Sequence, residues 1–215
     1  MKIKNCLKYL SYMMSIILCF CLMSGCGYDK RSPPERNIIS LLNQTEKIRY
    51  SSNPVSRKLS SDNVNKLASY GHDAIPILAE ELSKSRNPKR QGIVIATLAN
   101  IGGSEAEKIL LQYANDNNAG VRAGVAIGLR VFGSNESLEA LMDMAKNDRH
   151  PQVRMAAVLS LGSYKGEKVI DFLKSQCNDK NKDIQKAAKY SLGKRGQSQF
   201  VVPCPIKKHL HEHPQ

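Results

Sequence analysis

Residues 151–162 read PQVRMAAVLSLG, and this stretch is the clearest copy of a unit that recurs along the chain. One apolar position of the unit returns every 31 or 32 residues, at Leu67, Leu98, Leu129, Leu161 and Leu192. A repeat of this length is typical of stacked helical arrays. The sequence therefore predicts an array of similar units.

Each unit contains the pattern of two helices. In the second unit the apolar side of one helix ends at Gly102. The apolar side of a second helix follows, at Ala106, Ile109, Leu110 and Tyr113. Steps of three and four residues indicate helices with one buried stripe. First helices are expected at 62–70, 88–100, 119–131, 151–162 and 183–194, and second helices at 73–84, 104–115, 135–147 and 166–176. Strand-like alternation is not found, so the expected fold is all-α.

The units share a short motif as well as a period. Val153, Arg154 and Ala157 form a Val-Arg-x-x-Ala run, and residues 121–129 repeat most of it. These runs resemble the HEAT-repeat family, specifically its short bacterial, phycobilisome-lyase-like form. The resemblance covers about residues 61–196. It implies a right-handed α-solenoid of about four to five helix pairs with an N-terminal capping helix.

The resemblance also assigns a role to polar residues between the units. In that family an Asp and an Arg of neighbouring units commonly form a hydrogen-bonded ladder, which here implies structural roles for Asp116, Arg122, Asp148 and Arg154. Ser85, Gln91 and Gln185 stand at the equivalent places near the two ends, so the ladder is expected to be missing there. Gly124 and Gly128 are four residues apart, which suggests that a neighbouring helix backbone comes close to them.

The N-terminal segment predicts export and anchoring. Three lysines precede an uncharged stretch from Tyr9 to Tyr28, as in a signal peptide. Met23-Ser24-Gly25-Cys26 resembles the bacterial lipobox, which implies that residues 1–25 are removed and that Cys26 is lipidated. An uncleaved signal anchor is the alternative, because 20 uncharged residues can just span a bilayer. Both readings place the repeats outside the cytoplasm, at the cell membrane or the outer membrane.

Residues 26–60 are expected to hold the lipidated cysteine, a tether and a capping helix. Ile38, Ile39, Leu42 and Thr45 lie along one side of a helix that runs to about Tyr50, and residues 51–61 look like a loop. Residues 61–196 form the repeat domain, and residues 197–215 form a C-terminal tail. Cys177 falls on a core position of a helix, and a disulfide to Cys204 is an open alternative in an exported protein.

Charge separates the two kinds of helix. The expected first helices sum to +7, whereas the second helices hold ten acids against five bases. In HEAT arrays the second helices line the concave side, so the resemblance implies an acidic hollow that receives a basic or polar protein segment. A solvated helix face is the plainer interpretation. The partner-binding candidates are Glu80, Glu81, Glu105, Glu107, Glu136, Glu139, Asp143, Glu167 and Asp171.

The basic residues suggest anionic lipid headgroups rather than nucleic acid. The chain carries a net charge of +13, and removal of the leader leaves +10. Such a surplus favours attraction to anionic surfaces. Nucleic-acid binding is disfavoured by export and by the scarcity of stacking aromatics, which make up 6% of the chain.

An enzyme would depend mainly on the tail. His209, His211 and His213 are candidate metal ligands, but they follow two prolines and nothing in the sequence fixes their geometry. We therefore expect no cofactor and no catalytic residue, and we identify no small-molecule substrate. The expected function is a membrane-anchored, non-catalytic scaffold that binds a protein partner in the cell envelope. The alternative is a metal-dependent or lyase-like enzyme whose site the tail or a partner completes.

Overall fold

The computed structural model describes residues 31–48 and 54–195. The chain divides at Asn37 into two units, and only residues 31–36 of the first unit are described. These residues open helix α2 (Pro33–Lys47) with a capping box, in which Ser32 and Glu35 exchange backbone-to-side-chain hydrogen bonds of 3.3 and 3.4 Å.

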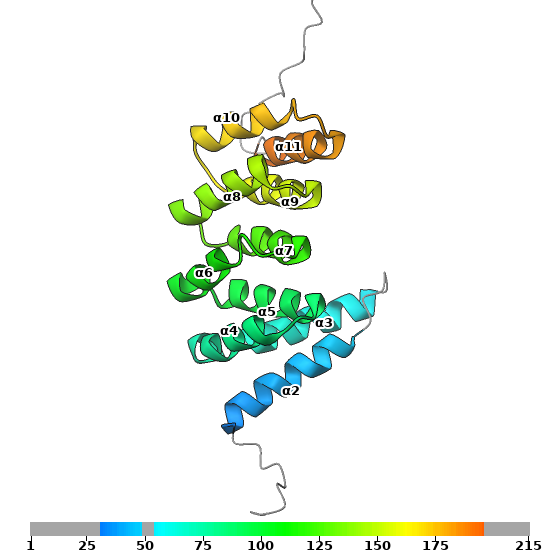
Figure 1. The fold of residues 1–215 in the computed structure, drawn as a ribbon, viewed down its shortest axis with the longest axis vertical. Helices are drawn as coiled ribbons and strands as arrows, with labels where there is room; N and C mark the ends of the chain where they lie inside the picture. Colours follow the sequence, from blue (N-terminus) through cyan, green and yellow to red (C-terminus); the bar gives the residue numbers. More distant parts are fainter. Residues whose placement is uncertain (1–30, 49–53, 196–215) are drawn as a thin grey trace, which may run out of the picture. The chain divides into compact units, whose positions relative to one another are not determined.

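Helices make up the second unit, and its described residues contain no strand (Figure 1). The first-helix layer comprises α3 (Pro54–Ala68), α5 (Pro88–Ile101), α7 (Ala119–Leu129), α9 (Pro151–Leu161) and α11 (Lys182–Arg195). The second-helix layer comprises α4 (Ile75–Lys84), which the short 3-10 helix η1 (Gly71–Ala74) precedes, α6 (Gly103–Gln112), α8 (Asn135–Asn147) and α10 (Glu167–Gln176). The all-α solenoid expected from the sequence is confirmed.

The repeating leucines form the centre of the array. Leu67, Leu98, Leu129 and Leu161 are fully buried, and Leu192 is nearly so. In the first-helix layer α3, α5, α7, α9 and α11 pack successively against one another, and α8 and α10 pack against the first helix that follows each of them. Because each leucine lies between neighbouring helices, truncation of one to alanine is expected to cost about 2–5 kcal/mol.

The first unit of the array differs from the sequence prediction. Residues 54–61 belong to α3 and not to a loop, so the first helix begins at Pro54 instead of residue 62. Proline suits a helix start because its missing N–H has no partner there in any case. The prediction failed because few of the described side chains of α3 are buried: among them Leu67 and Ser60 are buried and Val64 is partly covered. A helix with so narrow an apolar side gives little periodic signal.

Two smaller predictions can also be compared with the structure. Ile38, Leu42 and Thr45 are buried on α2 as expected, although Ile39 is only partly covered. Near Gly124 and Gly128 the close neighbours are side chains and not a helix backbone, because the atoms nearest an added Cβ belong to Ile95, Ala99 and Leu110. The expected backbone approach is therefore wrong.

Cys177 occupies the core position that the sequence predicted, at the C-terminal end of α10. It is 6% exposed and disulfide-bonded. Cys204, the partner considered from the sequence, lies outside the described residues, as do the leader, Cys26 and the C-terminal tail.

Candidate functional site

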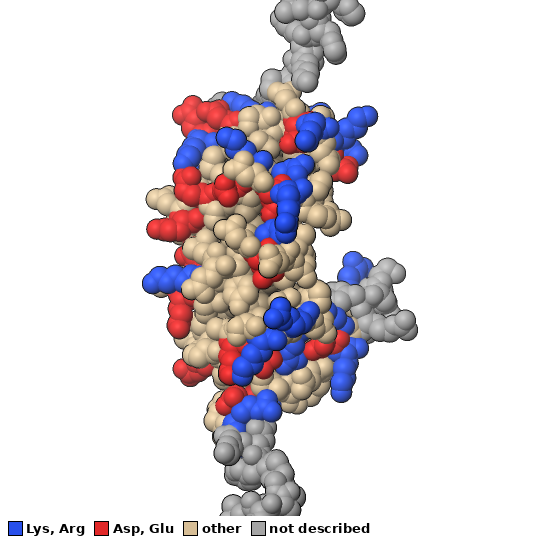
Figure 2. Space-filling model, in the orientation of Figure 1, with Lys and Arg blue, Asp and Glu red and all other residues tan. Residues whose placement is uncertain are grey.

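Acidic side chains gather along the edge of the molecule that the second-helix layer forms (Figure 2). The nine acidic candidates for partner binding differ in whether their carboxylates have partners within the chain. Four are exposed but have a neighbouring partner: Glu80 pairs with Lys84, Glu139 with Lys168, Asp171 with Lys174, and Asp143 accepts a hydrogen bond from Asn147. Their charge is therefore partly satisfied within the chain.

Glu81 is turned toward an internal ion pair. Its carboxylate lies 2.6 Å from the guanidinium of Arg90, which also contacts Glu46 at 3.0 Å and the amide oxygen of Asn43 at 2.8 Å. The ammonium of Lys89 donates to the backbone carbonyls of Glu46 and Ile48. Residues of α5 thus fasten the C-terminal end of the capping helix, and Glu81 is not available to a partner.

Glu107 belongs to a second internal cluster. Its carboxylate accepts hydrogen bonds from the hydroxyls of Ser134 and Ser137, and the Ser137 distance is 2.5 Å. The nearby Tyr164 hydroxyl donates to the Leu129 carbonyl at 2.8 Å. Burial raises the pKa of Tyr164, hydrogen bonds from Ser137 and Gly133 oppose that rise, and the charge of Glu107 adds to it. This cluster ties three successive units together.

Glu105, Glu136 and Glu167 are the remaining candidates. Each lies exposed in the first turn of its helix, in α6, α8 and α10 respectively, at intervals of 31 residues. Within the described part of the chain they take part in no ion pair and no side-chain hydrogen bond. Of the nine acidic residues, these three are the ones whose charge is open to an outside ligand.

The charge count of the first helices overstates how basic their surface is. Arg90 is neutralised by two glutamates, and Arg122 pairs with Asp148. Arg154 is partly buried and donates to the Asp148 carbonyl at 2.9 Å. These three arginines lie near the N-terminal ends of α5, α7 and α9, where they hold neighbouring segments together. Their charge is used inside the molecule, which weakens the case for a basic face directed at lipid headgroups.

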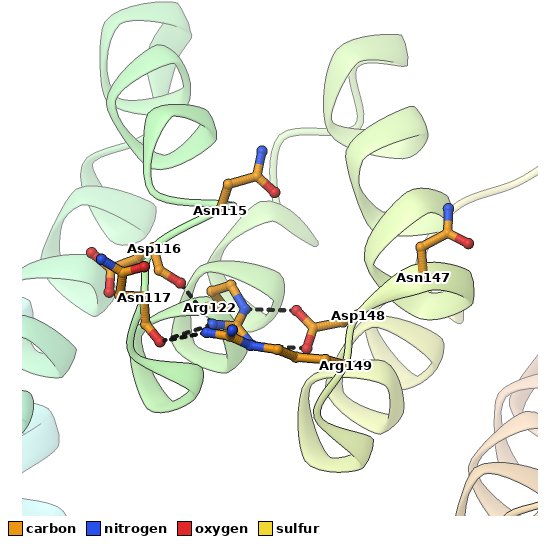
Figure 3. A pocket seen from close by; sticks show the side chains of 7 residues that line it. All are labelled: Asn115, Asp116, Asn117, Arg122, Asn147, Asp148 and Arg149. Atoms are coloured by element: carbon orange, nitrogen blue, oxygen red, sulfur yellow. Dashed lines mark hydrogen bonds and ion pairs between the residues drawn. The ribbon is translucent and has the colours of Figure 1, made fainter.

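Arg122 makes the most complete contact of the ladder residues. Its Nε and Nη2 atoms donate to both oxygens of Asp148 at 2.6 and 2.9 Å, and its Nη1 atom donates to the Asp116 and Asn117 carbonyls at 2.6 and 3.2 Å (Figure 3). The side chains of Arg122 and Asp148 are 6% and 7% exposed. One guanidinium therefore joins the α6–α7 loop to the α8–α9 loop.

A hydrogen bond within each unit is kept even where glutamine stands in place of arginine. Arg122, Arg154 and Gln185 each donate to the carbonyl six residues earlier, in Asp116, Asp148 and Asp179, at 2.6–2.9 Å. Gln185 keeps this bond within its unit, because an amide can donate to a carbonyl as a guanidinium does. Among the described residues, the ladder bond between units joins Arg122 to Asp148 and is not found at Gln185, as expected.

The ladder aspartates accept hydrogen bonds from N–H groups just before the first helices. Asp116, Asp148 and Asp179 each accept from the N–H two residues later, in Asn118, His150 and Asn181. Asn118 and Asn181 then accept in the same way from the N–H two residues beyond them. The loops before α7 and α11 therefore each contain two successive Asx turns. In the loop before α7 this arrangement orients the carbonyls that accept from Arg122.

The environment of Asp148 shifts its pKa. Burial by itself raises the pKa of this carboxyl, but hydrogen bonds from Arg122 and the His150 N–H, with the charges of Arg122 and Arg149, outweigh burial and lower it. Asp148 is thus held in its ionised form beside Arg122.

A polar cavity of about 320 Å³ lies over this ion pair, and Arg149, Asn115 and Asn147 line it with the ladder residues (Figure 3). Arg149 donates to the Asn117 carbonyl at 3.2 Å. Arg122 and Asp148 already use their charges and hydrogen bonds on each other. We therefore interpret the cavity as the solvent-facing side of a contact that stabilises the fold, and not as a ligand site. None of the nine acidic candidates lines it, and none lines a second, mainly apolar cavity between α5 and α7.

Sequence reasoning missed Arg90, Ser134, Ser137 and Tyr164. Arg90 stands one residue before Gln91, the position equivalent to Arg122, so a comparison of the units passes over it. A signal for the second cluster was present: Glu107 occupies the place that Ile75, Leu138 and Ile170 take in the other units. A carboxylate at an otherwise apolar position indicates a buried polar network.

Metal and membrane features are not found in the part of the chain that is described. Residues 31–48 and 54–195 contain no group of three or more potential His, Cys, Asp or Glu ligands. No helix in these ranges is both long and apolar enough to cross a bilayer. The predictions for the leader, for Cys26 and for His209, His211 and His213 all fall outside the described residues.

Comparison with known proteins identifies the family. The model of the HEAT repeats matches residues 75–162 and 141–201, which together exceed half of the chain. The chain belongs to the HEAT-repeat family. Its HEAT units are α3 with α4, α5 with α6, α7 with α8, and α9 with α10, and α11 supplies the first helix of a further unit. No curated protein matches the chain.

Solved structures share this HEAT fold at low sequence identity. The complex of CpcE and CpcF of phycocyanin lyase from Nostoc sp. aligns with a TM-score of 0.57 and 20% identity over 73% of this chain and 98% of that chain. Human deoxyhypusine hydroxylase in complex with glycerol aligns with a TM-score of 0.51 and 17% identity over 76% of this chain and 64% of that chain. HEAT arrays of this kind therefore occur in enzyme-related proteins and in assemblies of two chains.

Proposed function

We propose that the chain is a membrane-anchored HEAT-repeat scaffold that binds a protein partner in the cell envelope and carries no catalytic site of its own. The observation that supports this most directly is the row formed by Glu105, Glu136 and Glu167. These side chains are exposed, lack partners among the described residues, and each lies in the first turn of one of three successive second helices. A row of this kind suits a basic or polar segment that crosses several units.

The comparison with solved structures supports the choice of a protein ligand. The HEAT-like chain of phycocyanin lyase is described as part of a complex of two different chains, CpcE and CpcF. For the present chain, the binding surface would be the second-helix layer, because its unpaired acidic charge offers electrostatic complementarity to a basic partner.

Crosslinking in intact cells followed by mass spectrometry tests the proposal. The double variant Glu105→Lys/Glu136→Lys is expected to lower recovery of the main crosslinked partner at least about tenfold, since two favourable charge contacts become repulsive. The matched control, Asp62→Lys/Asp183→Lys, changes the net charge equally on the first-helix layer and is expected to retain the partner. Equal recovery from the two double variants would contradict the assignment of this surface.

Anchoring is tested separately at Cys26. With lipidation, Cys26→Ser is expected to lose incorporated acyl label and to leave the membrane fraction, because several acyl chains supply the attachment. An uncleaved signal anchor would instead keep the variant in the membrane fraction. The two readings of the leader therefore predict opposite fractionation results.

The alternative function is a metal-dependent or lyase-like activity that the tail or a partner completes. A chain truncated after Gly196 separates the two functions. A scaffold keeps its partner after the tail is removed, whereas a metal site built from His209, His211 and His213 disappears with it. Crosslinking recovery and zinc binding by the truncated and full-length chains are the two measurements.

A further inference from the structure

The disulfide of Cys177 joins the last unit of the array to another part of the chain. Cys177 is disulfide-bonded, and it is the one cysteine within residues 31–48 and 54–195. Its partner is therefore one of the cysteines that precede α2 or follow α11. These are Cys6, Cys19, Cys21, Cys26 and Cys204.

Cys177 lies at the junction between the last second helix and the last first helix. It is the C-terminal cap of α10, and it occupies the register that the buried residues Ala114 and Ala145 take in the interior units. Four residues separate it from the start of α11, which packs against α10. The bond of Cys177 is therefore fixed beside the N-terminal end of α11.

The length of chain after α11 is enough to bring Cys204 back to Cys177. Helix α11 has 14 residues and is about 21 Å long at 1.5 Å per residue. Cys204 stands nine residues after Arg195, the last residue of α11, and nine extended residues cover up to about 30 Å. The tail can therefore return along α11 to the place where that helix begins.

The cysteines before α2 are connected to the other end of the array. There α5 holds the C-terminal end of α2, and α7 and α9 lie between α5 and α11. Each step between packed helices measures about 8–10 Å. A bond from Cys26 to Cys177 would also close a loop of 150 residues, whereas one from Cys204 closes a loop of 26 residues at a smaller cost in entropy.

We infer that Cys177 and Cys204 form the disulfide, and that this bond holds α11 against α10. Within the described residues no second helix follows α11, so α11 lacks the partner that α5, α7 and α9 have. The closed loop contains all of α11. Because a closed loop has fewer unfolded conformations, the bond favours the folded position of this helix.

Formation of the bond needs an oxidant. Two thiols release two protons and pass two electrons to a disulfide compound such as glutathione disulfide, which becomes two thiols. Disulfides persist mainly outside the cytoplasm, so in cells the inference rests on the export that is part of the proposed function. The purified chain removes this dependence, because the oxidant is then supplied directly.

Peptide mapping of the purified full-length chain identifies the partner of Cys177. After oxidation with glutathione disulfide in detergent, trypsin without a reductant is expected to release residues 175–180 linked to residues 196–207, and a reductant should separate them. A link from Cys177 to any other cysteine, a link between two chains, or a free Cys177 thiol would overturn the inference. The expected link in the purified chain, with reduced cysteines in cells, would support the bond and contradict export.

Amide hydrogen exchange of the full-length chain tests the hold on α11. Reduction is expected to speed exchange in α11 at least about tenfold and to leave α7 unchanged, because the bond constrains only the last unit. Cys204→Ser should show the faster exchange with or without reductant. Cys26→Ser is the matched control and should behave as the wild-type chain does. If exchange in α11 does not respond to reduction, or if Cys26→Ser speeds it instead of Cys204→Ser, the inferred role of the bond is wrong.

Discussion

Arg122 connects two HEAT units through one planar group. Its guanidinium fits the Asp148 carboxylate with two parallel hydrogen bonds and uses its remaining donors on two loop carbonyls. Lysine could not reproduce this arrangement, because an ammonium lacks the fixed fork of donors. Removal of one partner from such a nearly buried pair leaves an uncompensated charge in a poorly hydrated place.

Asp148→Ala is therefore expected to lower the free energy of unfolding by about 3 kcal/mol. Urea denaturation monitored by far-UV circular dichroism measures the loss. Asp143→Ala is the control, because Asp143 is exposed on α8, which ends just before Asp148, and its change should cost less than about 0.5 kcal/mol. Similar losses in the two variants would show that the Arg122–Asp148 pair has no special contribution to stability.

The lowered pKa of Asp148 predicts a pH dependence. A depressed pKa in the folded state means that the ionised carboxylate stabilises the fold above its unfolded pKa, about 3.9. The difference in unfolding free energy between the wild-type chain and Asp148→Asn should be constant from about pH 5 to pH 8. It should shrink below about pH 4, as the folded carboxyl becomes protonated. A difference that grows on acidification would contradict the assigned direction.

Gly124 offers a substitution that should stabilise the fold. An added methyl would lie 3.6 Å from the Ile95 side chain, which is an ordinary contact, and alanine is favoured over glycine in a helix by about 1 kcal/mol. Gly124→Ala should therefore raise the free energy of unfolding by up to about 1 kcal/mol. Gly166→Ala is the contrast, because Gly166 has a φ of +107° that other residues rarely adopt, and it should lower stability. A destabilised Gly124→Ala chain would count against the observed packing.

At the scale of the elements, side chains of α5 hold the C-terminal end of α2. The described part of α2 buries Ile38 and Leu42, and its C-terminal end is held by polar side chains of α5. A repeat array exposes apolar surface at its ends, so a capping helix is needed there. The polar contacts between α5 and α2 include a part-buried ion pair, which can be removed without changing the core.

Arg90→Ala should loosen this cap selectively. The change leaves Glu46 and Glu81 without their shared cation, so amide hydrogen exchange is expected to become faster in residues 37–47 while α7, α8 and α9 keep their protection. Lys108→Ala on the exposed side of α6 serves as the control and should leave exchange of α2 unchanged. Faster exchange throughout the array would instead indicate that Arg90 supports the whole fold.

For the whole molecule, contacts between neighbours govern stability, as in other repeat arrays. Leu129 and Leu192 occupy the same register, but α7 has first helices packed on both sides of it, α5 and α9, whereas α11 packs against α9 and α10. A defect in the middle therefore weakens two interfaces between units, and a defect in α11 weakens one end.

Leu129→Ala and Leu192→Ala should consequently differ in how their effects spread. Both remove a buried leucine, at a cost of about 2–5 kcal/mol. Leu129→Ala is expected to reduce exchange protection from α5 to α9, whereas Leu192→Ala should affect mainly α10 and α11. Hydrogen exchange read by mass spectrometry compares the two variants. Identical exchange profiles would indicate a single cooperative unit instead of a chain of coupled HEAT units.

The sequence by itself determined the architecture, because the recurring leucines and the Val-Arg motif are local and periodic. Each repeating leucine must be buried, and a fixed period can bury all of them only by stacking. The same reasoning failed at α3, where few apolar residues produce a pattern.

Only the tertiary structure decided which charges are free and where the apolar groove between α5 and α7 lies. The sequence treats Glu81 and Glu105 as equal acids, but Arg90 reaches one of them from the next unit and no described cation reaches the other. Likewise, Gly92 and Ile127 are 35 positions apart and line one groove because α5 packs against α7. Ion pairs and grooves depend on side-chain positions across neighbouring helices, whereas the fold depends on a pattern within each helix.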